Sequence, residues 1–327
     1  MSGAPPVSEL REHRGMHHRI PLPPSLGAAF TLREAQAAGL GRARADARDL
    51  HRPFRGVRSA ELPETFAAVA ACGARRLKPG HRFVGVTAAR LWGLPHPRPW
   101  RQGELLEVVV PTGSTPPASR GIRGRRLAAE RARTWSIGPV AVVDPVAAVL
   151  SCIDGLTLSQ AVVLLDALLT DADNYPHLLR GRPVATPDEL AERIRSWPRL
   201  PGRDLILEAL SRARAGVESP KETETRLLIV DAGLPEPVVQ HEVRDGRRLV
   251  ARIDLAYPQW KIAIEYEGEE HRLDARRWRD DISRRRALEA AGWVVLRVTI
   301  EDLRRPSGFL ADLTAVVRTR THHALSS

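Results

Sequence analysis

Long apolar runs, cysteines and lysines are all scarce in this sequence of 327 residues. The longest apolar stretch, 139–153, contains Asp144, whereas a membrane-spanning helix needs about 18 or more apolar residues. The first 20 residues hold prolines and charges but no apolar signal segment. Two cysteines, Cys72 and Cys152, cannot form a disulfide framework or a four-thiolate metal site. These absences exclude a membrane-spanning helix and a disulfide scaffold, and we expect a cytoplasmic protein.

The charge is strongly basic and unevenly distributed. The net charge is +11 and the isoelectric point is about 10.8, which suits a polyanionic partner such as nucleic acid. Only three of the 50 basic residues are lysine, so the arginine content could also reflect a coding bias. From residue 217 onward, 19 basic and 19 acidic residues balance, and the surplus of 31 over 20 lies before it. This asymmetry predicts a basic binding module followed by a neutral module.

A helix–turn–helix pattern follows a polar, proline-rich segment, 1–25, that we expect to be disordered. Thr31 can cap a short helix, a glycine-containing turn follows at 39–41, and 42–50 has helical character. An extended piece, 52–58, completes the order of a winged helix-turn-helix over 26–60. Its second helix would present three arginines to double-stranded DNA: Arg42, Arg44 and Arg48. The alternative is an ordinary helical hairpin with a solvated basic face.

The middle of the chain has mixed character. Strands are predicted at 105–111 and 141–143, and helices at 87–92 and 158–169, which gives a mixed α/β segment over 61–170. A linker with helices follows over 171–216. The stretch 30–169 resembles the N-terminal region of AbiEi-like antitoxin proteins in the motifs FTLREAQAAGLGRARADARDLHRPFRGV, FVGVTAARLWGL and GPVAVVDPVAAVL. That resemblance implies a DNA-binding module with an attached mixed domain.

The acidic residues of the C-terminal third carry the chemistry. A helix is predicted from Ser219 to about residue 232, followed by strands at 250–256 and 261–267. Because side chains alternate along a strand, Glu265 and Glu267 share one face, and Asp254 can lie opposite them. Clustered carboxylates repel one another unless a cation neutralises them. Hard oxygen ligands of this kind suit Mg²⁺, with Mn²⁺ as the other possibility.

The same residues resemble a known family. Asp254, ten intervening residues, Glu265-x-Glu267-Gly268, His271 and the later VLRV motif are similar to Vsr-like endonucleases of the PD-(D/E)xK superfamily. The match is nearer still to their relatives that are described as a domain of unknown function. The resemblance implies a mixed sheet flanked by helices over 217–320, before a tail at 321–327, with Asp254 and Glu265 as metal ligands. It also implies that Glu222 on the first helix faces the site.

One departure from the superfamily concerns the proton transfer. The superfamily lysine falls at Glu267, so we expect Glu267 or His271 to accept a proton from a metal-bound water. Structural alternatives exist for three residues: Glu222 as a partner of Ser219 and Arg226, His271 as a packing residue, and Arg284 as a solvated helix charge instead of a phosphate contact. The sequence contains no HExxH, CxxC, P-loop or GxGxxG pattern.

These features predict an α+β and α/β multidomain protein with a winged helix-turn-helix, a mixed segment and a restriction-endonuclease-like domain. The predicted function is a metal-dependent DNA endonuclease with an N-terminal DNA-binding module. The missing lysine favours an alternative, a catalytically inactive DNA-binding regulator or antitoxin-like repressor. An RNA nuclease is a third possibility.

Overall fold

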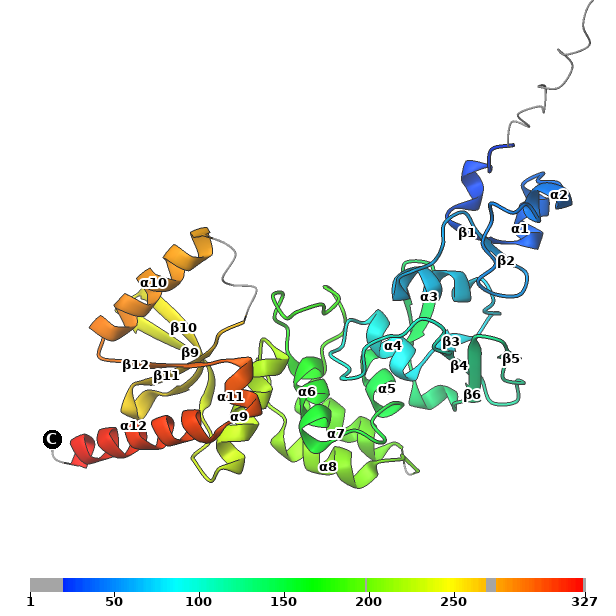
Figure 1. Ribbon diagram of the computed structural model, residues 1–327. Helices are drawn as coiled ribbons and strands as arrows, with labels where there is room; N and C mark the ends of the chain where they lie inside the picture. Colours follow the sequence, from blue (N-terminus) through cyan, green and yellow to red (C-terminus); the bar gives the residue numbers. More distant parts are fainter. Residues whose placement is uncertain (1–19, 198, 269–274, 326–327) are drawn as a thin grey trace, which may run out of the picture. The chain divides into compact units, whose positions relative to one another are not determined.

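The computed structural model describes residues 20–197, 199–268 and 275–325. The chain divides into two compact units, Met1–Leu77 (unit 1) and Lys78–Ser327 (unit 2), and each is described by itself. Both contain helices and sheets, which confirms the coarse prediction of an α+β multidomain protein (Figure 1). Among the described residues, every helix is too short or too polar to cross a membrane.

Unit 1 consists of a two-stranded antiparallel sheet and short helices packed on a small core. Thr31 caps the first α-helix through a reciprocal capping box with Glu34, as the sequence predicts. The second helix ends at Ala45 instead of residue 50. Arg58 explains the early end, because its guanidinium donates a hydrogen bond to the carbonyl oxygen of Ala45 at 2.8 Å, where a further helical turn would place a backbone N–H. The elements are η1 (Pro24–Leu26), β1 (Ala29–Thr31), α1 (Leu32–Ala37), α2 (Arg42–Ala45), β2 (Val57–Ser59) and α3 (Phe66–Ala74).

The first part of unit 2 is a six-stranded sheet in the order β5-β6-β4-β3-β8-β7, followed by helices. Helix α6 begins after a capping box at Thr157 and is buried along most of its length, so it is a core helix. The strands are β3 (Arg82–Phe83), β4 (Leu106–Val110), β5 (Ala118–Ser119), β6 (Ile122–Arg126), β7 (Thr134–Ile137) and β8 (Val140–Val143). The helices are α4 (Gly85–Leu91), η2 (Ala129–Arg131), α5 (Pro145–Leu150), α6 (Leu158–Leu169), α7 (Pro187–Arg195) and α8 (Arg203–Arg212).

The second part of unit 2 is a four-stranded sheet in the order β12-β11-β10-β9. Strands β11 and β12 are parallel, with α10 between them in the chain, and the other pairs are antiparallel. The strands are β9 (Val238–Asp245), β10 (Arg248–Tyr257), β11 (Ile262–Tyr266) and β12 (Val294–Val298). The helices are α9 (Pro220–Asp231), η3 (Pro258–Trp260), α10 (Ala275–Ala290), α11 (Ile300–Arg304) and α12 (Ser307–Leu325). Helix α12 thus continues past residue 320, where the sequence analysis places the end of this domain.

Helices cover both faces of this sheet. Ile262 and Ile264 of β11 lie in one buried cluster with residues of α9 and α12, whereas Ala263 lies in another with Leu288 of α10. Figure 1 shows α10 and α12 on opposite sides of the strands. The alternation predicted for β11 is therefore confirmed, and it places even-numbered and odd-numbered side chains on different faces.

Candidate functional site

The candidate site lies where β10, β11 and the beginning of α9 meet. The antiparallel register pairs Leu255 with Ile264, so the next pair brings Asp254 opposite Glu265, as the sequence predicts. One oxygen of Asp254 also accepts a hydrogen bond from the main-chain N–H of Tyr266 at 3.3 Å. The fold thus places the two predicted metal ligands on adjacent strands, with the Asp254 carboxylate oriented by the backbone of β11.

Glu222 lies in the first turn of α9, near enough to Asp254 for its charge to raise the pKa of that aspartate. Its own N–H donates to the Ser219 hydroxyl, so Ser219 is the helix cap. The Glu222 carboxylate accepts instead from the main-chain N–H of Glu218 at 3.0 Å and from the side-chain amide of Gln240 at 2.8 Å. The reciprocal capping box considered for Glu222 is therefore wrong. Its suggested ion pair with Arg226 is also wrong, because Arg226 bonds to other carboxylates.

Gln240 is a site residue that the sequence analysis missed, together with the whole of strand β9. The register of β9 with β10 pairs Val239 with Leu255 and His241 with Ile253, which places Gln240 opposite Asp254. Its φ of 50° lies in the left-handed region, which is uncommon for a residue other than glycine. Backbone conformations of this kind cost about 1 kcal/mol or more and concentrate at functional sites. No signal in the sequence around Gln240 indicates the kink.

The electrostatics of the site are those of two like charges in a poorly solvated place. Burial, and after it the nearby charge of Glu222, raise the pKa of Asp254 from its ordinary 3.8 to about 7. The Tyr266 N–H and the positive charge of Arg284 offset only part of this effect. Burial likewise raises the pKa of Glu222, which is 6% exposed. A bound cation would favour the ionised form of both carboxyl groups.

The other acidic residues are held by arginines. Arg284 of α10 donates to Glu265 at 3.1 Å. The arginine that the sequence suggested as a phosphate contact or a solvated charge is therefore paired with a predicted metal ligand. Arg297 of β12 lies 3.3 Å from a carboxylate oxygen of Glu267. Both glutamates thus lie beside fixed positive charges on the α10 face. His271 lies outside the described residues.

The carboxylates of the site are possible ligands for a divalent cation. Across the described part of the chain, no three His, Cys, Asp or Glu side chains converge as a ready-made metal site. Magnesium does not need such a cage, because it keeps several waters and usually takes one or two carboxylates plus substrate phosphates. Glu222 and Asp254 supply two hard oxygen donors whose mutual repulsion a cation would relieve. These residues therefore fit a hydrated Mg²⁺ or Mn²⁺ ion.

The three arginines predicted to contact DNA differ in their surroundings. Arg44 is 12% exposed, and its guanidinium forms two hydrogen bonds to Asp49 at 3.0 and 3.1 Å, so it supports the fold of unit 1. Arg42 is 96% exposed beside Asp46, and Arg48 is also exposed. Arg42 and Arg48 therefore have the accessibility that phosphate contacts require.

Comparison with known proteins identifies relatives without assigning a function. No protein-family model matches the chain. A stretch of 104 residues is 34% identical to the uncharacterized protein MT2308 of Mycobacterium tuberculosis (strain CDC 1551 / Oshkosh) and to the uncharacterized protein Rv2248 of strain H37Rv. The match covers 32% of this chain and 38% of each relative.

Among solved structures, the RV2827C protein from Mycobacterium tuberculosis is similar at 13% identity, over 67% of this chain and 84% of that one. The TM-score is 0.31, a level that carries no argument about a shared fold or function.

Proposed function

We propose that this chain is a divalent-metal-dependent nuclease whose active site lies between α9, β10 and β11. The observation that carries the proposal is the buried pair of like charges, Glu222 and Asp254, with the pKa of Asp254 near 7. Strongly raised carboxyl pKa values concentrate at functional sites. A helix glutamate, an aspartate on one strand and Glu265 on the next also agree with the arrangement that the resemblance to PD-(D/E)xK endonucleases implies.

The proposed roles follow from the contacts. Asp254 and Glu222 would hold the ion, with Glu265 as the third ligand that the resemblance implies. A bound Mg²⁺ would supply charge stabilisation at the phosphate and a lower pKa for an attacking water. Gln240 holds the Glu222 carboxylate, and the Tyr266 N–H orients Asp254. These contacts keep the ligands in place before substrate arrives.

The proton acceptor is assigned to Glu267. It lies next to the site at the end of β11, and the hydrogen bond from Arg297 holds its carboxylate in place. A general base needs to reach the water that it deprotonates at about 3 Å, and a strand end beside the ligands offers that position. His271 is the alternative acceptor from the sequence.

We assign nucleic-acid binding to unit 1. Its order β1-α1-α2-β2 is that of a helix-turn-helix followed by a strand, with Arg42 and Arg48 exposed. Exposed arginines supply the salt-dependent part of affinity for double-stranded DNA, and the surplus of positive charge lies before residue 217. Unit 1 would therefore hold the substrate that unit 2 cleaves.

A second candidate function is a DNA-binding regulator without turnover. The ion pair between Arg284 and Glu265 favours it, because an arginine there supplies a cation from the protein itself. The acid at position 267, where the superfamily has a lysine, points the same way. In this alternative the chain acts through binding alone.

Nicking of supercoiled plasmid separates the two functions. We expect the purified chain to nick with Mg²⁺ or Mn²⁺, and Asp254→Asn to lose this activity by about a thousandfold or more, since the substitution removes a ligand charge. Asp245→Asn, an exposed change at the far end of β9, is the control and should keep full activity. Equal cleavage by Asp254→Asn would contradict the site. An inert wild type on duplex, single-stranded and RNA substrates would favour the regulator.

A further inference from the structure

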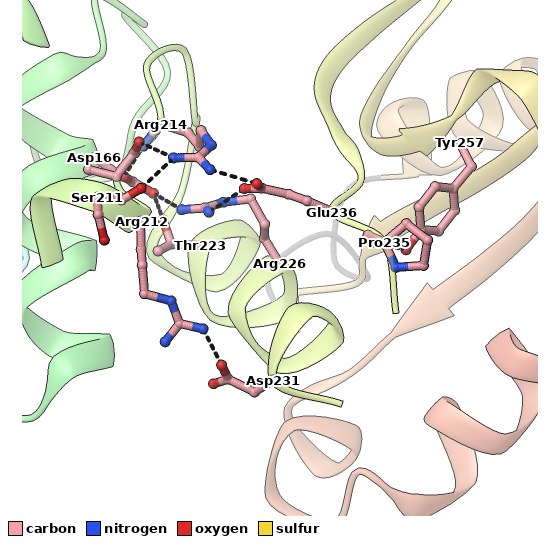
Figure 2. A network of polar contacts seen from close by, with 11 residues as sticks. Asp166, Ser211, Arg212, Arg214, Thr223, Arg226, Asp231, Pro235, Glu236 and Tyr257 are labelled. Carbon is pink, nitrogen blue, oxygen red and sulfur yellow. Dashed lines mark hydrogen bonds and ion pairs between the residues drawn. The ribbon is translucent and has the colours of Figure 1, made fainter. Parts of the chain in front are cut away.

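A buried ion pair ties helix α9 to helix α6, 60 residues earlier in the chain. Asp166 and Arg226 are 0% and 1% exposed in their side chains, and their atoms Oδ2 and Nη2 are 2.9 Å apart. Asp166 also accepts from the Thr223 hydroxyl at 2.8 Å and from the main-chain N–H of Arg214 at 2.7 Å. The second terminal nitrogen of Arg226, Nη1, donates to Glu236 at 2.8 Å. Figure 2 shows these contacts converging on the side of α9 that faces α6.

The contacts of Asp166 fall on the same part of α9 as the candidate site. Thr223 directly follows Glu222, and Arg226 is one helical turn further on. A second attachment holds Glu218, which precedes the helix cap Ser219, because Asn174 donates to the Glu218 carboxylate at 2.6 Å. The main-chain N–H of Glu218 in turn donates to Glu222. The segment before residue 217 therefore contacts the chain on both sides of Glu222, at Glu218 and within α9.

The chemistry of this cluster indicates that it fixes the orientation of α9 and does not merely fill space in the core. Apolar residues of similar size often pack as well as a buried ion pair, because burying two charges loses their hydration. Directional hydrogen bonds do what apolar contacts cannot, since they fix the rotation of a helix about its axis. Rotation of α9 would carry Glu222 away from Asp254 and from Gln240. The bonds of Asp166 oppose that rotation.

We propose that Asp166 is a positioning residue for Glu222, and that α6 is therefore part of the catalytic unit. The catalytic meaning rests on the proposed function, whereas the positioning of Glu222 can be tested without it. On this account the functional module extends back to α6 instead of beginning at residue 217. Charge placement at the site then depends on an aspartate that touches neither the ion nor the substrate.

The test uses four variants of the full chain. Asp166→Asn weakens the ion pair, Thr223→Val removes one hydroxyl donor, and Thr223→Ser restores that donor. Thr225→Val is the matched control, because Thr225 is equally buried on α9 but its hydroxyl bonds to the carbonyl of Lys221 in the same helix. All variants are compared in conditions where denaturant curves show them folded. If Asp166→Asn does not fold, Thr223→Val against Thr225→Val decides the question.

The first readout is the NMR signal of the Gln240 side-chain amide. Its hydrogen bond to Glu222 shifts its resonances and slows its exchange with solvent. We expect Asp166→Asn and Thr223→Val to shift these signals and to speed exchange by about tenfold, with recovery in Thr223→Ser. Unchanged Gln240 signals in the folded Asp166→Asn and Thr223→Val proteins, or equal changes in Thr225→Val, would overturn the proposal.

The second readout is metal-dependent cleavage. We expect Thr223→Val to lower kcat by about 10- to 100-fold with little change in KM, because misplacing a ligand by about an ångström affects the reacting geometry more than DNA binding. A rise in KM with unchanged kcat would contradict the positioning role. If wild type is inert but the Gln240 signals respond as expected, the proposed nuclease function fails while the positioning of Glu222 by Asp166 stands.

Discussion

Helix α9 takes part in two buried polar clusters that differ in one respect, the balance of charge. Asp166 and Arg226 are oppositely charged and almost completely enclosed. Glu222 and Asp254, about one turn away, are like-charged. Burial raises the pKa of both aspartates, to about 7 for Asp254, so the sign of the nearest partner and not the pKa shift separates the two clusters. Burial penalises the charged groups in both clusters. Asp166 forms an ion pair with Arg226, whereas the charge of Arg284 offsets only part of the pKa shift at Asp254. One helix thus takes part in an ion-paired cluster and in a pair of like charges, and the proposed function makes the second the binding cluster.

The largest expected effect on stability comes from breaking the balanced cluster. Arg226→Met should lower the free energy of unfolding by about 3–5 kcal/mol, because it leaves Asp166 buried without its cation. Urea denaturation measures the change. Arg285→Met is the control, since the pair of Arg285 with Glu289 is about half exposed and should change stability by at most about 0.5 kcal/mol. A loss under about 1 kcal/mol for Arg226→Met would remove the contrast between the two clusters.

Removing a charge from the unbalanced cluster should have the opposite sign. The raised pKa of Asp254 means that the folded protein holds this proton more tightly than the unfolded chain, whose value is near 3.8. The stability that protonation contributes is therefore complete below pH 4 and is lost as pH rises through about 7. At pH 8 without metal, Asp254→Asn should be more stable than wild type by about 2–4 kcal/mol.

Melting temperatures measured between pH 4 and pH 8 check the sign. The difference between wild type and Asp254→Asn should shrink as pH falls, because the wild-type carboxyl then becomes neutral as well. Asp245→Asn should follow wild type throughout. A difference that grows at low pH would show that Asp254 is stabilised as an anion.

Glu267 sharpens the comparison, because it is an acid paired with Arg297 and lies at the edge of the Glu222–Asp254 cluster. If it accepts the proton of the attacking water, Glu267→Gln should slow cleavage by about a hundredfold, while stability changes by at most about 1 kcal/mol. Glu267→Lys would introduce the lysine that the resembled superfamily has at this position. Cleavage by Glu267→Lys but not by wild type would identify the natural protein as a regulator that binds without turnover, and full activity in Glu267→Gln would exclude the assigned role.

The smallest expected effects concern the arginines of unit 1. Arg42→Ala and Arg48→Ala should each weaken DNA binding by a few-fold and reduce the slope of log K against log salt by about one, as expected for phosphate contacts. Arg44→Ala should instead destabilise unit 1, because Arg44 binds Asp49. Binding titrations at several salt concentrations distinguish these results. Unchanged binding in the first two variants would remove unit 1 as the DNA-binding surface.

Local patterns predicted much of the fold. The apolar periodicity of α6 and the Ser219 cap of α9 are readable over a few neighbours, and the alternation of β11 placed Glu265 correctly against Asp254. Strand β9 was not predicted, because its kink at Gln240 depends on pairing with β10 and not on nearby residues. The end of α2 was misplaced for a similar reason, since Arg58 acts from another element.

The candidate site was predictable only in part for the same physical reason. Spacing along two strands identified its acids, but Asp166 gives no local sign that it bonds to a residue 60 positions later. Equally, the four-residue spacing of Glu222 and Arg226 indicated an ion pair, yet longer-range carboxylates took the arginine. Charge partners in a core are decided by tertiary packing, which a single sequence shows poorly.

The most direct test of the central claim is the shift in melting temperature on adding Mg²⁺ or Mn²⁺ at pH 8. A ligand that binds only the folded state raises stability according to its concentration relative to Kd. We predict a clear rise for wild type and for Asp245→Asn, and none for Glu222→Gln or Asp254→Asn, because each of these removes a charge that the cation would balance. Equal shifts in all four proteins, or no shift in wild type, would contradict a divalent-cation site at Glu222 and Asp254.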